Sequence, residues 1–250
     1  MSNPFLVSEP GQASPGGFDP NGRVVDAGRP VAWLTRGWNL FMKNPGMWIA
    51  ITVAVLAILV VLGMVPVVGQ LAANFLILIF AAGLMLGCRS LEQGGELRFE
   101  HLFAGFRQNT GNLVMVGVLY LVGLVAIMVV TFAVTGGGAL TGAMMGHGAG
   151  MAMAAGSLLV AMLFMLVLMV PLVMGVWFAP ALVIFHDTAP LAAMKASFSA
   201  CLRNILPFLV YSVILLILGF VAAIPFMLGF LLLVPVLVGA QYASYTDIFE

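Results

Sequence analysis

Residues 190–204 read PLAAMKASFSACLRN, and the sequence contains this pattern twice more. Residues 30–44, PVAWLTRGWNLFMKN, align with it without a gap, because each stretch opens on proline, repeats apolar residues along one face and closes on a base and an asparagine. Residues 95–109, GELRFEHLFAGFRQN, form a weaker copy in which phenylalanines take three of the apolar positions. Apolar residues at this spacing predict amphipathic helices.

A long apolar stretch follows each copy, so the chain reads as three similar units. We expect an all-α membrane protein with six transmembrane helices in three parallel repeats, each made of an amphipathic interfacial helix and a two-helix hairpin. The repeats cover about residues 30–94, 95–188 and 189–250, within a single membrane domain at residues 29–250. Residues 1–28 are rich in proline, glycine and serine and have no apolar run, which predicts a disordered cytoplasmic tail.

The composition places the chain among integral membrane proteins. Hydrophobic residues make up 63%, charged residues 7%, and the mean hydropathy is +1.17. A typical soluble domain is about half apolar and about a quarter charged. The formal net charge of zero argues against a nucleic-acid partner. A span needs roughly 20 apolar residues to cross a hydrocarbon core of about 30 Å, and six stretches qualify: residues 48–65, 71–88, 113–134, 158–185, 207–224 and 226–243. We expect Pro171 and Pro180 to kink the fourth.

The basic residues give the orientation. All of them lie before the first span or in the loops after the second and fourth spans: Arg23, Arg29, Arg36, Lys43, Arg89, Arg98, Arg107, Lys195 and Arg203. The positive-inside rule then places both termini in the cytoplasm of a bacterial cell, in a multi-pass protein of the inner (plasma) membrane. The loop at residues 136–153 is expected to be external.

Catalytic patterns are scarce. The sequence has no Walker loop, HExxH, GxSxG or dinucleotide fingerprint, and no charged residue falls within the six spans. We therefore expect neither an enzyme nor a cofactor. Polar residues inside the spans favour hydrogen bonds between helices; the alternative is that Asn74, Tyr120 and Tyr211 line a polar path.

The external loop carries thioether and imidazole groups that suit Cu(I): Met144, Met145, His147, Met151 and Met153. The competing interpretation is that methionine fills irregular apolar gaps, since the chain has 17 of them. Glycines recur there at steps of four, at positions 138, 142, 146 and 150. On a helix they would form a smooth packing face, whereas the low helix propensity of glycine favours a mobile loop.

The cytoplasmic side offers a second candidate site. The copies end in Lys43, Arg107 and Arg203, and three basic interfacial helices around one axis would form a ring at the depth of lipid phosphates. The full candidate set adds four residues: Arg36, Asn44, Asn109 and Asn204. The competing interpretation is that the bases only orient the chain and the asparagines only cap helices.

Four short runs carry a resemblance to a known group: WNLFMKNP at residues 38–45, WFAPALV at 177–183, AMKASFSACLRN at 193–204 and QYASYTDIF at 241–249. They resemble an uncharacterised group of proteobacterial inner-membrane proteins, which look like distant relatives of the membrane domain attached to some glycerophosphodiester phosphodiesterases. The resemblance implies a six-helix inner-membrane protein. It transfers no catalytic residue, because the phosphodiesterase chemistry belongs to a separate soluble domain.

Three functions are compatible with these patterns. We expect a non-enzymatic, membrane-embedded module that binds or moves lipids or other amphiphiles, with membrane lipids, anionic ones among them, as partners. The first alternative is a structural or assembly protein of the inner membrane, with a second copy or another membrane protein as partner. The second alternative is copper handling by the external loop.

Overall fold

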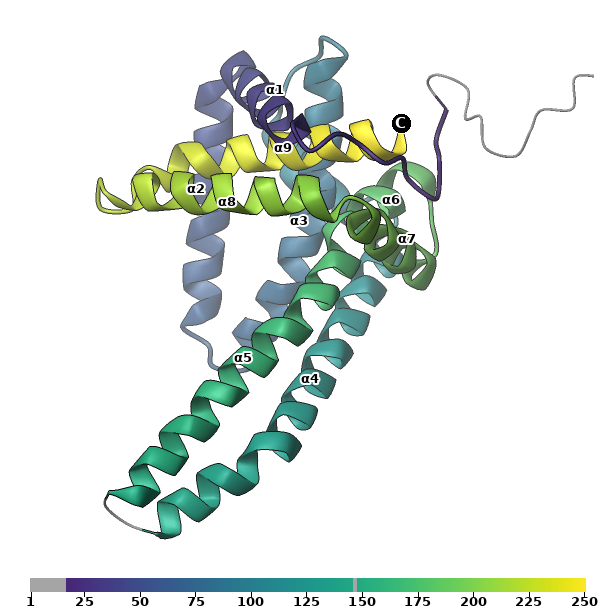
Figure 1. Ribbon diagram of the computed structural model, residues 1–250. Coiled ribbons are helices and arrows are strands. Elements are labelled where there is room, and N and C mark those ends of the chain that lie inside the picture. The colour runs from purple at the N-terminus through teal and green to yellow at the C-terminus, as the bar shows by residue number, and fades with distance from the viewer. Residues whose placement is uncertain (1–16, 146–147) are drawn as a thin grey trace, which may run out of the picture.

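The computed structural model describes residues 17–145 and 148–250, and within them every regular element is a helix (Figure 1). The elements in chain order are α1 (Arg29–Lys43), α2 (Pro45–Gly63), α3 (Val68–Glu92), η1 (Phe99–Phe106), α4 (Thr110–Met144), α5 (Ala149–Trp177), α6 (Ala179–His186), α7 (Pro190–Arg203), α8 (Ile205–Ala223) and α9 (Phe230–Phe249). The predicted all-α class is therefore confirmed.

Six helical stretches among the described residues are long and apolar enough to cross a membrane. They are Pro45–Gly63, Val68–Glu92, Thr110–Gly142, Ala149–His186, Ile205–Ala223 and Phe230–Phe249. Each overlaps one predicted span, which confirms their number. The third and fourth are longer than predicted, because α4 continues to Met144 and α5 begins at Ala149.

The predicted external loop at residues 136–153 is thus helical at residues 136–144 and 149–153. A Cβ atom on Gly142 would lie only 2.7 Å from the backbone nitrogen of Ala154, and one on Gly138 would collide with the Ser157 hydroxyl. Glycine here allows α4 and α5 to approach closely. Of the two alternatives for these glycines, the structure therefore agrees with a helical packing face and not with a mobile loop. Gly146 and His147 lie outside the described residues.

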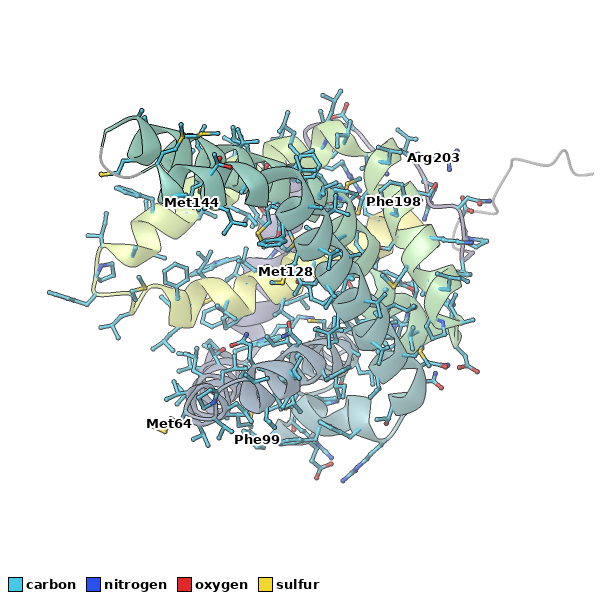
Figure 2. The ribbon with its side chains drawn as sticks, turned by 90° about the horizontal axis from the view of Figure 1, so that it is seen from below. Met64, Phe99, Met128, Met144, Phe198 and Arg203 are labelled. Atoms are coloured by element: carbon cyan, nitrogen blue, oxygen red, sulfur yellow. The ribbon has the colours of Figure 1, made fainter. Side chains whose placement is uncertain are left out.

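Three helical hairpins, α2–α3, α4–α5 and α8–α9, diverge from one base. In Figure 1 the α8–α9 hairpin runs across α2 and α3, and the α4–α5 hairpin slants away from both. Figure 2 shows the tips at Met64 and Met144 well apart. We call the common base the hub: α1, η1, α6 and α7 with the adjoining ends of the hairpins. Its largest fully buried side chains include Trp48, Phe178 and Tyr242.

The hairpins away from the hub expose apolar side chains. Val60 is 61% exposed on α2, Phe132 71% on α4 and Phe220 75% on α8. Exposed apolar helices of this length, whose backbone groups bond within the helix, are the form that a polypeptide takes in lipid. The hub is therefore the part that packs against itself, and the hairpins are the part that meets the membrane.

The second amphipathic copy folds differently from the other two. Residues 95–109 were expected to form a helix like α1, but only Phe99–Phe106 is helical, and it is a 3₁₀-helix. Leu102 and Gly105 are buried there, while Phe99, Phe103 and Phe106 are about 40% exposed. The three-repeat organisation stays a prediction.

α1 and α9 cross at a pair of glycines. A Cβ atom on Gly37 would collide with the carbonyl oxygen of Val236 and lie 2.7 Å from the nitrogen of Ala240, and one on Gly239 would lie 2.8 Å from the Gly37 Cα. Beyond this crossing, Arg29 pairs with Asp247. Acceptance of its hydrogen bond by Asp247 raises the pKa of Arg29. The first and last helices of the hub are thereby joined.

This crossing predicts the direction in which a glycine-to-alanine substitution changes the stability of the protein. Replacing an exposed helical glycine by alanine normally stabilises a helix by about 1 kcal/mol. We expect Gly37→Ala to do the opposite and to destabilise the protein by about 1–3 kcal/mol, because the added methyl forces two backbones apart. Thermal unfolding in detergent measures this. Gly219→Ala is the control, since nothing lies within 4 Å of its Cβ position; a higher unfolding temperature for Gly37→Ala would refute the close crossing.

Candidate functional site

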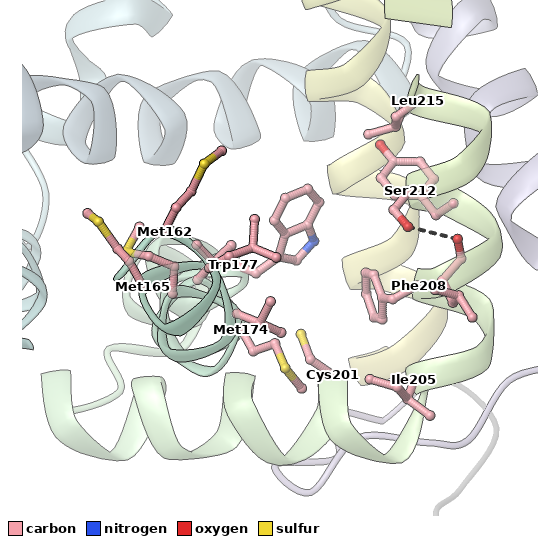
Figure 3. Close-up of a pocket in the computed structure, with 15 residues that line it drawn as sticks. Met162, Met165, Met174, Trp177, Cys201, Ile205, Phe208, Ser212 and Leu215 are labelled. Carbon is pink, nitrogen blue, oxygen red and sulfur yellow. Dashed lines mark hydrogen bonds between the residues drawn. The ribbon is translucent and has the colours of Figure 1, made fainter. Parts of the chain in front are cut away.

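An apolar groove separates α5 from α8 (Figure 3). Its volume is about 690 Å³. The described residues that line it come from α5, α7 and α8, and none of them is charged: Met162, Met165, Leu166, Met169, Val170, Val173, Met174, Trp177, Cys201, Ile205, Phe208, Leu209, Tyr211, Ser212 and Leu215. Methionine side chains adapt their shape to a flexible ligand. The groove thus offers a deformable, uncharged surface to the membrane interior.

The groove begins at a break between α5 and α6. At this point the hydroxyl of Ser197, on α7, donates to the carbonyl oxygen of Met174 at 2.6 Å and accepts from the backbone nitrogen of Phe178 at 2.9 Å. These two backbone groups would bond to each other in a continuous α-helix. A side chain inserted in this way bends a helix. The predicted kink is therefore real, although α5 runs through Pro171 without a break.

One carbonyl group beside the break also has a side-chain partner. Gln241 on α9 donates its side-chain amide to the carbonyl oxygen of Trp177 at 2.6 Å, and Pro180 lies in the first turn of α6, where proline is tolerated. The break is thus held from two sides, by α7 and by α9. Trp177 is fixed at the hub end of the groove.

Polar groups in the groove are few. Ser212 donates its hydroxyl to the carbonyl oxygen of Leu209 at 2.8 Å, within α8. The indole nitrogen of Trp177 is buried and has no hydrogen-bond partner among the described residues, and its ring packs edge-on against Phe208 and Tyr211. Burial raises the pKa of the Cys201 thiol to about 12, so this thiol stays protonated at neutral pH.

A second cavity lies on the other side of Trp177. It has a volume of about 330 Å³ and is lined by Asn74, Tyr120 and Gln241, with Val173 and Trp177 shared between it and the groove. The predicted polar path is therefore only partly assembled, because Tyr211 lies in the groove. Asn74 also bonds within its own helix, to the carbonyl oxygen of Gln70 at 2.8 Å.

The bases predicted to bind lipid phosphates have protein partners in three cases out of four. Lys43 donates to the carbonyl oxygen of Leu91 at 2.6 Å. Arg203 donates to the carbonyl oxygens of residues 21 and 22, at 3.2 and 3.3 Å. Arg36 pairs with Glu92. Arg107 lies beside a polar pocket that also contains Arg98 and two glutamates. The anionic-lipid ring stays a prediction, with Arg107 as its most available base.

The three asparagines of the predicted ring all bond to backbone groups. Asn44 caps α2 by accepting from the nitrogen of Met47 at 3.3 Å. Asn109, which has a positive φ of 54°, donates to the carbonyl oxygen of Val183 at 3.1 Å. Asn204 is fully buried and binds the N-terminal segment. These side chains therefore hold backbone groups of the protein itself, and their binding of lipid head groups stays a prediction.

The segment at residues 17–28, which we call the strap, lies along the hub. Asp19 donates its backbone nitrogen to the carbonyl oxygen of Phe249 at 2.8 Å, and Arg23 donates to that of Ile248 at 2.7 Å. Phe18 stacks on His186 with ring centroids 3.6 Å apart. The predicted disordered tail is therefore wrong for these residues, because distant backbone groups pair with them; residues 1–16 lie outside the described part.

The methionines of the copper hypothesis sit at the tip of the α4–α5 hairpin. Met144 is 88% exposed, and Met145, Met151 and Met153 are exposed as well. His147, their predicted partner, lies outside the described residues. Within the part of the chain that the structure describes, no group of three His, Cys, Asp or Glu side chains could hold a metal. Copper binding stays a prediction.

The chain is 31% identical over 226 residues to a probable inner membrane protein of Burkholderia thailandensis. The alignment covers 88% of this chain and 82% of that protein. No family model and no solved structure matches the chain. The likeness to phosphodiesterase-linked membrane domains therefore stays a prediction.

Asn204 should decide whether the strap stays on the hub. Its side chain accepts from the nitrogen of Val25 at 2.8 Å and donates to the carbonyl oxygen of Arg23 at 2.9 Å. We expect Asn204→Ala to speed amide hydrogen exchange in residues 17–28 by roughly tenfold, since two partly buried hydrogen bonds to the strap are lost. Asn44→Ala, which removes the corresponding asparagine of the first copy, should leave this exchange unchanged. Unaltered exchange in Asn204→Ala would show that other contacts hold the strap.

Proposed function

The chain belongs to the same family as this probable inner membrane protein, and from that premise we propose that its groove binds the acyl chain of a membrane lipid or similar amphiphile. The protein is a multi-pass inner-membrane protein. In this proposal it acts as a binding module that performs no reaction. The observation that carries it is the uncharged groove between two helices of membrane length.

The groove has the size and the access that such a ligand requires. Its volume of about 690 Å³ falls within the range of about 300–1,000 Å³ that is usual for small-molecule sites. Met162 is 74% exposed, Leu166 61% and Leu209 60%, so an acyl chain can enter sideways from the bilayer. An acyl chain that enters the groove from the bilayer leaves contact with other acyl chains and not with water, so the hydrophobic effect does not favour the groove. Packing and polar contacts with the groove wall therefore provide the selectivity.

The same residues support binding and not catalysis. Ser212, Cys201 and Tyr211 are the side chains of nucleophile type in the described groove wall. The Ser212 hydroxyl is engaged with its own helix, and the Cys201 thiol stays protonated. A nucleophile needs an adjacent base, and the described lining contains no histidine, carboxylate or lysine to serve as one.

A role in membrane assembly is the second candidate, favoured by the length of α4. Its 35 residues correspond to about 50 Å, and its tip exposes Leu140 and Met144. A hairpin longer than the hydrocarbon core tilts or meets a partner. This alternative gains weight if the groove takes no ligand.

We propose the same orientation as the sequence predicts, and the position of the hub supports it. The basic residues of the helical domain lie in or next to it, so the positive-inside rule puts the hub and both termini on the cytoplasmic side. A phosphatase fusion at Gly148 should be active, in the periplasm, and one at Glu250 should be inactive. A fluorescent protein fused at the same two positions gives the complementary readout. Equal activity at both positions would rule out this orientation.

Photo-crosslinking tests the binding site itself. A monoacylglycerol whose chain carries a diazirine is incorporated into nanodiscs with the protein, and the adducts are mapped by peptide mass spectrometry. We expect adducts concentrated on groove residues such as Met165 and Leu209. Leu166→Trp, which fills part of the groove, should reduce them severalfold.

The matched control for this test is Leu163→Trp. Leu163 is 56% exposed on the same helix but does not line the groove. The control should leave the adduct pattern unchanged. Adducts spread evenly over all exposed apolar faces, with no effect of Leu166→Trp, would contradict the proposed function and favour an assembly role.

A further inference from the structure

Tyr211 is a polar side chain in the groove that the described part of the protein leaves unsatisfied. It is only 4% exposed, and its ring packs edge-on against Trp33 and Trp177, with centroids 6.0 and 6.2 Å away. Its hydroxyl forms no hydrogen bond with another described residue, and the side chain lines the groove. The hydroxyl oxygen itself is not among the fully buried unpaired atoms of the described residues, so it is accessible. Tyrosine hydroxyls in apolar surroundings usually find a partner. The open side of Tyr211 is the groove, so the partner fits there.

The surroundings restrict the charge of that partner. No described residue of the groove wall is charged, and a charged group placed there would lose its hydration without an opposite charge. Arg203 does not supply a positive charge to the groove. It follows Cys201 by two positions on α7, which places it on the other side of the helix, and its guanidinium binds the strap. The polar group beside Tyr211 is therefore uncharged.

The position of Tyr211 along α8 restricts the chemistry further. It is the seventh residue of the helix, about 9 Å from Ile205 at the hub end. Arg203, just before α8, marks the level at which bases meet the head groups. In a glycerolipid the ester carbonyl lies immediately below this level, and the acyl chain continues away from it. Away from the hub, the lining residues reach Met162 on α5 and Leu215 on α8.

We propose that the groove takes an uncharged glycerolipid of the diacylglycerol type, whose ester carbonyl accepts a hydrogen bond from the Tyr211 hydroxyl. One acyl chain lies along the methionines of α5. This inference rests on the proposed function and adds the ligand class to it. It differs from the anionic-lipid ring, in which the bases of the hub select the phosphate.

The test compares two hydroxyl deletions by native mass spectrometry of the purified protein in detergent. Tyr211→Phe keeps the ring and removes the donor, and we expect it to retain roughly three- to tenfold less dioleoylglycerol. Tyr120→Phe removes the same group from the neighbouring cavity and should retain as much as wild type. Unfolding temperatures should agree among the three proteins. Dioleoylphosphatidylglycerol should compete poorly, and its retention should not depend on Tyr211.

Each other result overturns part of the account in a distinguishable way. Equal retention of dioleoylglycerol by Tyr211→Phe and wild type, with loss in Leu166→Trp, overturns the ligand class but leaves the groove as an acyl-chain site. Tighter retention of dioleoylphosphatidylglycerol, or of decylubiquinone in a Tyr211-dependent manner, also overturns the class. Full retention in Leu166→Trp overturns the proposed function as well.

Discussion

The hydroxyl of Ser197 stands between two backbone groups of a neighbouring segment that would otherwise bond to each other. By bonding to Met174 and Phe178 it joins α7 to the end of α5 and separates α5 from α6. Without this insertion the fourth span would continue as one helix of 38 residues, and α7 would lose these two hydrogen bonds to it. The bend allows α6 to turn into the hub, where Leu182 and Val183 are fully buried. The groove is the space that the bend leaves between α5 and α8.

Much of the fold could be predicted from local pattern. Long apolar runs indicated six spans, and the structure has six apolar helices of that length among the described residues. Helices also form where the first and third copies predicted them, at α1 and α7. Prediction failed where distant contacts decide. Glycine disfavours a helix locally, yet Gly138 and Gly142 lie inside α4 because α5 packs closely against them. The strap has the composition of a disordered tail, but backbone groups at the other end of the chain hold it.

The candidate site was only partly visible in the sequence. Tyr211 could be singled out as a polar residue in an apolar run, but its separation from Asn74 and Tyr120 by Trp177 depends on how three hairpins meet. The role of Ser197 had no signal, because a serine in an amphipathic helix reads as solvent-facing. Lys43 and Arg203 could be read only as free bases, since no sequence pattern identifies the backbone carbonyls that accept their hydrogen bonds.

A density map of the protein in lipid nanodiscs, obtained by electron cryo-microscopy, tests the central claim most directly. The claim is that the bend at Phe178 keeps α5 and α8 apart and leaves a groove that a lipid chain occupies. The account predicts α5 and α6 separated at Phe178, with elongated density between α5 and α8 that ends beside Tyr211. A continuous helix through Phe178, or α8 packed directly on α5 with no space between them, would contradict it.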